Sequence, residues 1–475
     1  MPLSNAGIKL RKRPPGSGHS SLPSKMGIDI ASYGPSEPVT LAIIGCGSRG
    51  QAYSAYAVAE PTKCKVVAIA EPRPKTRKLF AEAHVVDKTL IFETWQDLLK
   101  ASQETIKTVG KRLADAVLIA VQDQMHMEVT LAFAEQGYHI LCEKPMATSI
   151  DDCIKMEAAV KKANIIFGMG HVLRYSPYNK AVSDIVLSGE LGQLINIIHE
   201  EPIGYFHFAH SYVRGSWSKE EDSCFSLMTK SCHDIDLICH WLTPSAPKRV
   251  SSFGSLLHFR KERKPVEAGN AKRCFDCAYE RTCPYSAKKI YLDPVSKGQL
   301  GWPAAVIVDG IPDIENVTHA LRNGSYGRCV YEHDNNVCDN QVVNLEFASG
   351  ATVSFTMVAQ TSLICERQSR LHFSHGEIVG DMDTFTVTDF RTGKSTHHAP
   401  AHEGGHHGGG DLGLIRTFIE AVRTGRQELL GTDVSEVLKS HMTVFAAEQS
   451  RRDGTVVDCE KFEREAKARV LGESP

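Results

Sequence analysis

A lysine at the end of an apolar stretch is the first residue whose type and position suggest chemistry. The segment HILCEKPMA, residues 139–147, places Lys144 between Glu143 and Pro145, directly after an apolar run of strand length. Ligands of open α/β sheets lie beyond the carboxyl ends of the strands. We therefore expect the ammonium of Lys144 at a ligand site. The alternative is an ordinary lysine at the surface end of a strand.

A glycine-rich turn near residue 45 has the spacing of a dinucleotide-binding fingerprint. GCGSRG sets Gly45, Gly47 and Gly50 in the order G-x-G-x-x-G, after an apolar run and before a helical pattern, and Glu71 ends the next apolar run. The three glycines allow a tight turn, close approach to a pyrophosphate, and packing of helix on strand. Free N–H groups at the helix start favour phosphate. The pattern predicts a dinucleotide site, with a structural glycine turn as the alternative.

The acid after the second apolar run bears on which dinucleotide binds. A carboxylate at Glu71 accepts a hydrogen bond from the 2′-hydroxyl of an adenosine ribose and repels a 2′-phosphate, which favours NAD. Arg73, two residues further on, could pair with the 2′-phosphate of NADP instead. We expect NAD and keep NADP open.

A histidine and an aspartate share one face of a predicted helix. KSCHDIDLICHWL, residues 230–242, has a helical pattern in which His233 and Asp236 are one turn apart. A neutral imidazole with a pKa near 6.5 can accept a proton at neutral pH. A buried histidine with purely structural hydrogen bonds is the alternative.

The elements that must position these residues change character along the chain. From residue 39 to about 170, short apolar runs alternate with helical patterns, which is typical of a parallel sheet covered on both faces. Further on, apolar and polar residues alternate between turn glycines, as in antiparallel sheets. We predict an α/β protein with a doubly wound Rossmann domain over 38–172, followed over 173–475 by an α+β domain with a large, mainly antiparallel open sheet.

Two segments fall outside this pattern. Residues 1–37 are basic and rich in Pro, Gly and Ser without a hydrophobic core, so we predict a disordered leader rather than a signal peptide, with a basic transit or nuclear signal as the alternative. Residues from about 257 to 330 are polar and are predicted to form an insert in the second domain.

The motifs together resemble the glucose-fructose oxidoreductase, inositol dehydrogenase and rhizopine-catabolism (GFO/IDH/MocA) family of NAD(P)-dependent oxidoreductases. The resemblance rests on GCGSRG, ADAVLIAVQDQMHMEVTLAFAEQGYHILCEKPMA, SGELGQL and KSCHDIDLICHWL, which together span about 39–245. Weaker likeness runs from YGRCVYEHDNNVCDNQVVNLEF to GGHHGGGDLGLIRTF. It implies a Rossmann fold, a bound NAD(P), a small carbohydrate or cyclitol substrate, and pairing of the open sheet into homodimers or homotetramers.

The resemblance also implies roles for individual residues. Lys144 matches a lysine near the nicotinamide and a substrate hydroxyl, where an ammonium stabilises a developing alkoxide. His233 and Asp236 match a His-x-x-Asp pair whose histidine accepts a proton. The expected cofactor contacts are Gly45, Gly47, Ser48, Arg49, Gly50, Glu71, Arg73, Gln122, His126, Glu143 and Lys144.

One position departs from the family pattern. Many family dehydrogenases place an aspartate four residues before the histidine, where this chain has Thr229 followed by Lys230. Lys230 is therefore a further catalytic candidate that would replace the acid with a cation.

Residues that suit a polyhydroxylated ring occur in three segments. Arginine and histidine can hydrogen-bond to hydroxyls, and aromatic faces contact C–H groups; plain packing is the alternative for each. The candidates are Arg174, Tyr175, Tyr212, Arg214, Trp217 and His407. HHGGGD, which ends at Asp411, resembles a histidine-glycine turn of NAD-dependent glycosidases in the same family; the alternative is a loop before a helix capped by Asp411.

The 14 cysteines are mostly scattered in apolar runs, which suits reduced thiols in a cytoplasmic protein. CFDCAYERTC is different because it groups Cys274, Cys277 and Cys283. A fourth thiolate from Cys329 or Cys338 would close a tetrahedral, structural zinc site. Reduced thiols in a packed loop are the alternative.

Charge and composition narrow the function. The formal net charge of −2 gives no electrostatic case for nucleic-acid or membrane binding, and no run of about 18 apolar residues occurs. The favoured hypothesis is an NAD(P)-dependent oxidoreductase acting on a CH–OH group of a sugar, sugar derivative or cyclitol. The alternatives are a redox glycosidase that oxidises its substrate transiently, and a non-catalytic nucleotide sensor.

Overall fold

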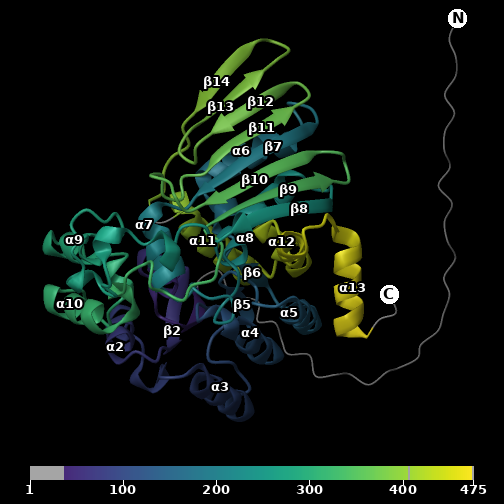
Figure 1. The fold of residues 1–475 in the computed structure, drawn as a ribbon. Coiled ribbons are helices and arrows are strands. Elements are labelled where there is room, and N and C mark those ends of the chain that lie inside the picture. The colour runs from purple at the N-terminus through teal and green to yellow at the C-terminus, as the bar shows by residue number, and fades with distance from the viewer. Residues whose placement is uncertain (1–36, 405–406, 473–475) are drawn as a thin grey trace, which may run out of the picture.

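The computed structural model describes residues 37–404 and 407–472 (Figure 1). The predicted leader lies outside the described residues, apart from its last position. The chain forms two sheets, a parallel one in the first half and a larger, mainly antiparallel one in the second, so the predicted α/β fold is confirmed. Over the described ranges, no helix combines the length and apolar character needed to cross a membrane.

The first sheet has six parallel strands in the order β3-β2-β1-β4-β5-β6. Its strands are β1 (Val39–Ile44), β2 (Cys64–Ala70), β3 (Ile91–Phe92), β4 (Ala116–Ile119), β5 (His139–Cys142) and β6 (Phe167–Met169). The helices of this half are α1 (Ser48–Ala59), α2 (Pro74–Ala83), α3 (Trp95–Val109), α4 (His126–Glu135) and α5 (Ile150–Ala163). The strand order reverses between β1 and β4, which is where ligands bind in such sheets.

The second sheet has nine strands in the order β14-β13-β12-β11-β7-β10-β9-β8-β15, and only β7 and β10 pair in parallel. Its strands are β7 (Leu194–Pro202), β8 (Pro247–Ser255), β9 (Asn340–Phe347), β10 (Thr352–Val358), β11 (Gln368–Phe373), β12 (Gly376–Gly380), β13 (Phe385–Asp389), β14 (Lys394–His398) and β15 (Val457–Asp458). Several strands bury every second residue, because one face packs on helices.

Helices of the second half lie between the two sheets and beside them (Figure 1). They are α6 (Pro177–Ser188), α7 (Tyr205–Phe208), α8 (Ser226–Trp241), α11 (Gly410–Thr424), α12 (Val434–Asp453) and α13 (Cys459–Leu471). Helix α12 packs against α8, β8 and α5. Helix α11 instead packs against α1 and β1, and its Leu414 and Phe418 join the apolar core around β1 and β2. A helix from the C-terminal part of the chain thus completes the first layer.

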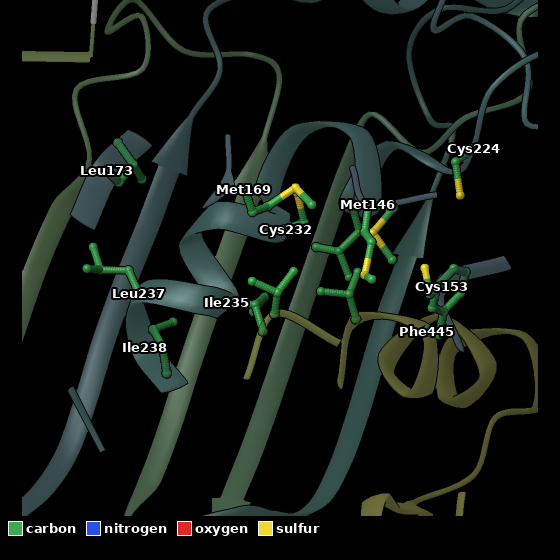
Figure 2. Close-up of a cluster of buried hydrophobic side chains, with 14 of the residues drawn as sticks. Met146, Cys153, Met169, Leu173, Cys224, Cys232, Ile235, Leu237, Ile238 and Phe445 are labelled. Carbon is green, nitrogen blue, oxygen red and sulfur yellow. The ribbon is translucent and has the colours of Figure 1, made fainter. Parts of the chain in front are cut away.

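An apolar cluster at the junction of the two sheets fixes α8 against the loop that follows β5. Figure 2 shows Cys232 and Ile235 of α8 gathered with Met146 and Met169, and all four side chains are buried. The positions of Lys144, in that loop, and of His233, on α8, therefore depend on one core.

The region between β8 and β9 has a small core of its own. It contains α9 (Asp293–Ser296), α10 (Ile314–Asn323) and a π-helical turn, Lys288–Leu292. The buried apolar residues that form this separate core are Cys274, Ala287, Ile290, Tyr291, Val295, Ala304, Val317 and Leu321.

Candidate functional site

The glycine turn after β1 can accept only glycine at two positions. Gly45 has φ +92°, and a Cβ there would lie 2.3 Å from the carbonyl oxygen of Ala120. A Cβ on Gly50 would lie 2.1 Å from the carbonyl oxygen of Gly45. Gly47 is the N-cap of α1, and no side chain caps this helix, so its first N–H groups can bind an external anion. The turn therefore fits the pyrophosphate of a dinucleotide, with Ser48 and Arg49 supplying backbone N–H groups.

Glu71 and Arg73 form an ion pair beside this turn. The Glu71 carboxylate accepts the backbone N–H of Cys46 at 2.9 Å and the Nε–H of Arg73 at 2.8 Å. Burial alone would raise the pKa of Glu71, but the hydrogen bonds from Arg73 and Cys46 bring it below the ordinary value. A Cβ on Gly47 would lie 3.3 Å from Nη2 of Arg73, so this guanidinium lies next to the turn. An ionised acid and an arginine thus share the place expected for the adenosine ribose.

Lys144 is half-buried where the β5 strand ends. Its Nζ donates to the backbone carbonyl of Thr229 at 2.5 Å and lies 5.6 Å from the centre of the Trp217 ring. The indole N–H of Trp217 donates to Asp123 at 2.7 Å, which fixes the ring under the ammonium. The Lys144–Pro145 peptide bond is cis. The predicted lysine therefore lies against α8 with an aromatic face beside it.

Two predicted cofactor residues behind this loop have other partners. His126 is fully buried, with Nδ1 2.7 Å from the carbonyl oxygen of Pro145, so its side chain holds the loop and does not face a ligand. Glu143 accepts the Tyr53 hydroxyl at 2.6 Å and the Lys144 backbone N–H at 3.0 Å. Gln122 is exposed at the carboxyl end of β4, and its contact with the cofactor stays a prediction.

Arg49 links three parts of the site. Its Nε donates to Glu143 at 2.7 Å, and its two terminal nitrogens donate to Asp411 at 3.0 and 2.8 Å. The side chain of Arg49 therefore joins the glycine turn and the loop after β5 to the first turn of α11.

His407 and Asp411 form a pair on that same helix turn. Nδ1 of His407 lies 3.1 Å from Oδ1 of Asp411. Since an ionised carboxylate only accepts hydrogen bonds, Nδ1 carries the proton and Nε2 keeps a lone pair. Burial lowers the pKa of His407, although Asp411 opposes the shift. The imidazole is thus neutral at pH 7 and able to accept a proton. The alternative prediction that Asp411 caps α11 is wrong, because the N-cap is Gly409.

His233 is oriented by an arginine. Nη2 of Arg367 donates to Nε2 of His233 at 2.8 Å, and a guanidinium has no lone pair to offer in return. Nε2 must therefore be the acceptor, so Nδ1 bears the hydrogen; Nδ1 has no hydrogen-bond partner among the described residues. Burial lowers the pKa of His233 well below its ordinary value. The predicted proton-accepting role does not fit this geometry, in which His233 is a hydrogen-bond donor. Its ring centre lies 6.0 Å from that of His407.

Lys230 belongs to a buried charge network behind His233. Its Nζ lies 3.1 Å from Glu201 and 2.9 Å from Sγ of Cys365. Arg367 pairs with Glu201 at 2.5 Å and with Asp234 at 2.9 Å. Two cations thus balance two carboxylates. The ammonium of Lys230 supports the position of Arg367 and is not free to replace a catalytic acid.

Five other predicted residues have structural partners. Asp236, fully buried, accepts both Nε (2.5 Å) and Nη2 (2.8 Å) of Arg174. Tyr175 donates to the carbonyl of Leu430 at 2.8 Å. The guanidinium of Arg214 donates to backbone carbonyls of Arg328 and Tyr285, and Tyr212 is buried in a stack on Phe208 and Trp217. None of these five side chains faces a ligand, because each is occupied by protein atoms.

Loss of the Arg174–Asp236 pair should destabilise the fold. Arg174→Met leaves a buried carboxylate without its counter-charge, so we expect the free energy of unfolding to fall by about 3–5 kcal/mol, measured by urea denaturation. Arg416→Met, which removes an exposed pair with Glu403, is the matched control and should cost about 1 kcal/mol or less. If both variants lost equally little free energy of unfolding, the Arg174–Asp236 pair would not be structural and Arg174 would again be a candidate substrate contact.

A buried group of His171, Cys232 and His441 has the compactness of a metal site, with ligand atoms within 4.8 Å of one another. Both ring nitrogens of His441 are already used. Nε2 of His441 accepts the backbone N–H of Met146 at 2.9 Å, and its Nδ1 lies 2.9 Å from the carbonyl oxygen of Val437. His441 therefore positions the loop after Lys144 and has no lone pair left for a metal.

Several residues of the site were not expected from the sequence. They are Arg367, Asp234, Glu201, Cys365, Asp123 and, as a site carboxylate, Asp411. Only Asp411 had a local signal, because it follows a glycine turn and a histidine. Glu201, Cys365 and Arg367 lie outside every motif, and Asp123 and Asp234 lie inside quoted motifs that assign them no role.

Comparison with known proteins gives a consistent result. The GFO/IDH/MocA family model described as an oxidoreductase family with NAD-binding Rossmann fold matches residues 39–171, and that of its C-terminal alpha/beta domain matches 184–459. The oxidoreductase YteT of Bacillus subtilis (strain 168) is 22% identical over 337 residues, which is 66% of this chain and 74% of that protein.

Two further similarities are informative. The 2,7-anhydro-N-acetylneuraminate hydratase of Escherichia coli (strain K12) is 27% identical over 149 residues, 31% of this chain and 39% of that protein. A levoglucosan dehydrogenase solved with NADH and levoglucosan aligns with a TM-score of 0.61 at 18% identity, over 89% of this chain and 100% of that one. At this identity the structural likeness shows a common fold.

Proposed function

Because the chain belongs to the GFO/IDH/MocA oxidoreductase family, we propose that it is an NAD-dependent oxidoreductase acting on a CH–OH group of a sugar, sugar derivative or cyclitol. The observation that carries the proposal is the grouping of Lys144, His233 and His407 beside the glycine turn that fits a dinucleotide. When bound, NAD supplies the two-electron acceptor or donor for the carbinol carbon.

Different side chains accept the proton of the substrate hydroxyl and stabilise its oxygen. Nε2 of His407 accepts the hydroxyl proton, and Asp411 stabilises the imidazolium that results. The ammonium of Lys144 and the Nδ1–H of His233 donate to the oxygen as negative charge develops on it. The face of Trp217, fixed by Asp123, offers a surface for the C–H groups of a sugar ring.

The NAD preference rests on Glu71. Its ionised carboxylate repels a 2′-phosphate, and its ion pair neutralises Arg73, the arginine beside the glycine turn. We expect Glu71→Ser to raise kcat/KM with NADP relative to NAD by about tenfold to a hundredfold, because Arg73 is then free to pair with the phosphate. Arg73→Ala is the control and should weaken only NADP. A wild-type enzyme that prefers NADP would contradict the assignment.

A redox glycosidase or hydratase is the second candidate. It is favoured by the base at His407 in a glycine turn and by the relative named as a hydratase, since addition of water involves no net oxidation. Here the transient ketone would acidify a neighbouring C–H, a leaving group would be eliminated, water would add, and the ketone would be reduced again.

One experiment separates the two candidates. The purified protein is incubated with NAD⁺ and a panel of sugars, anhydrosugars and glycosides in D₂O, while NADH absorbance and product NMR are recorded. Accumulating NADH with a ketosugar supports the oxidoreductase. Product carrying ring deuterium without net NADH supports the second candidate. Nucleotide binding without turnover of any substrate would favour a sensor and reject both.

A further inference from the structure

The region between β8 and β9 brings four cysteines to one cavity. Cys274, Cys277 and Cys283 come from one short segment. The backbone N–H of Cys329 donates to the carbonyl of Lys272 at 2.8 Å, and a β-bridge joins the neighbouring residues Arg273 and Arg328. All four cysteines line the same cavity, and none of them forms a disulfide.

The cavity also holds a buried cation that lacks a counter-charge. Arg214 is 2% exposed, lines the cavity, and has one terminal nitrogen, Nη1, without a hydrogen-bond partner. Within residues 37–404 and 407–472, no carboxylate lies within ion-pair distance of its guanidinium. The one acid that lines the cavity, Glu280, is bonded to Ser286 and Lys288. Burying an unpaired charge costs free energy, so an anion bound in the cavity would stabilise the Arg214 guanidinium.

Hydrogen bonds already point at one of the sulfurs. Sγ of Cys274 receives the backbone N–H of Ala287 at 3.4 Å and Nη2 of Arg214 at 3.5 Å. These two N–H donors are placed to orient and support Cys274 as a metal ligand.

We propose that Cys274, Cys277, Cys283 and Cys329 bind a metal centre through four thiolates. Four thiolates around a divalent ion carry a formal net charge of about −2, which Arg214 partly neutralises.

Zinc and an iron–sulfur cluster share this ligand chemistry. Tetrahedral zinc, with Zn–S near 2.3 Å, brings its sulfurs to about 3.8 Å from one another. In the part of the chain that the structure describes, only the group of His171, Cys232 and His441 has three ligand atoms within 4.8 Å, so the four cysteine sulfurs are spread more widely. Cys277 and Cys283, which are only partly buried, have room to close around zinc, whereas a four-iron cluster accepts a wider set.

The centre would hold this region against both ends of the candidate site. Trp302 packs edge-on against His207 and His210, at 5.0 and 5.2 Å between ring centres, and His207 lies beside Cys365. At the other end, Asp309 accepts the backbone N–H of Thr76 at 2.9 Å, in the first turn of α2. The metal centre therefore stabilises contacts on the substrate side and on the ribose side of the cofactor site.

Metal analysis tests the proposal independently of catalysis. The full chain is purified anaerobically without chelators, and bound metal is measured by inductively coupled plasma mass spectrometry together with visible absorbance. We expect about one zinc, or about four irons with a visible charge-transfer band, per chain. Cys277→Ser and Cys329→Ser should lower the bound metal at least tenfold, while Cys239→Ser, on α8 outside the cavity, should retain it.

Thiol reactivity gives the second readout. In the native protein these four cysteines should be protected from a thiol reagent, and a chelator with a denaturant should release them. Wild-type protein that contains no metal, or in which peptide mapping finds a disulfide among the four, would overturn the proposal. Because the wild-type measurement alone decides this, variants that fail to fold do not affect the outcome.

Discussion

Replacing Lys144 with methionine is expected to lower kcat/KM for oxidation by about 10²–10³-fold. The ammonium is held by the carbonyl of Thr229 and by the face of Trp217, so it is fixed before the substrate binds. Methionine has a similar length but no charge, and the developing alkoxide would lose its main cation. Affinity for NAD, measured by fluorescence titration, should change only a few-fold, because the glycine turn binds the phosphates.

The control for this variant is a lysine with no role in the site. Lys180→Met, on the exposed face of α6, should leave both the rate and the NAD affinity unchanged. If Lys144→Met retained activity within threefold of wild type while folding normally, Lys144 would be an ordinary lysine at a strand end.

His407→Asn is expected to lower kcat by about 10²–10⁴-fold, the range for loss of a general base. Asparagine can still hydrogen-bond to Asp411 but cannot take a proton, so the hydroxyl proton would have to pass to water. The ion pair between Arg49 and Asp411 should survive, and with it the thermal stability of the protein.

The exposed His402, which lies in the same loop, provides the matched control. His402→Asn should behave as wild type in both rate and stability. A His407→Asn variant with a normal kcat and a raised KM would show that this side chain only binds substrate.

The fold could be predicted where burial leaves a pattern in the sequence. Strands such as β4 and β5 are buried on both faces and stand out as apolar runs. Strand β14, KSTHH, has no buried residue and sits at the edge of the second sheet, so no hydrophobic pattern marks it. The packing of α11 on the first layer was likewise hidden, because an amphipathic pattern shows that a helix is half-buried but not against what.

The site could be predicted only where its residues share a local motif. Short motifs with a structural reason for their spacing contain Gly45, Gly50 and Lys144. The base at His407 depends on Asp411, which is held by Arg49 from the other end of the chain. A pattern within a few residues carries no information about such a contact.

Residue type alone did not predict the role of a side chain whose hydrogen-bond partner lies elsewhere in the fold. His233 was predicted to accept a proton, because a free imidazole can. Arg367 instead donates to its Nε2, so the hydrogen of the ring is on Nδ1 and His233 can only donate there. Arg174 suits a sugar by its chemistry, yet Asp236 occupies its guanidinium. In both cases a buried partner far along the chain sets the function of the side chain.

The pH dependence of kcat/KM from pH 5 to 9, measured with the substrate that the panel identifies, tests whether His407 is the catalytic base. Oxidation needs neutral His407, so the rate should be full above its pKa and fall as the pH drops through it. This fall in rate, the acid limb of the profile, should lie below pH 6.5, because burial lowers the pKa of His407 in spite of Asp411. The cations Arg49 and Arg367 lower this pKa further.

Two variants identify the group that titrates. We expect His233→Asn to be slower but to keep the fall in rate at low pH, whereas His407→Asn should lose it. A limb that persists in His407→Asn and vanishes in His233→Asn would contradict the account and make His233 the base.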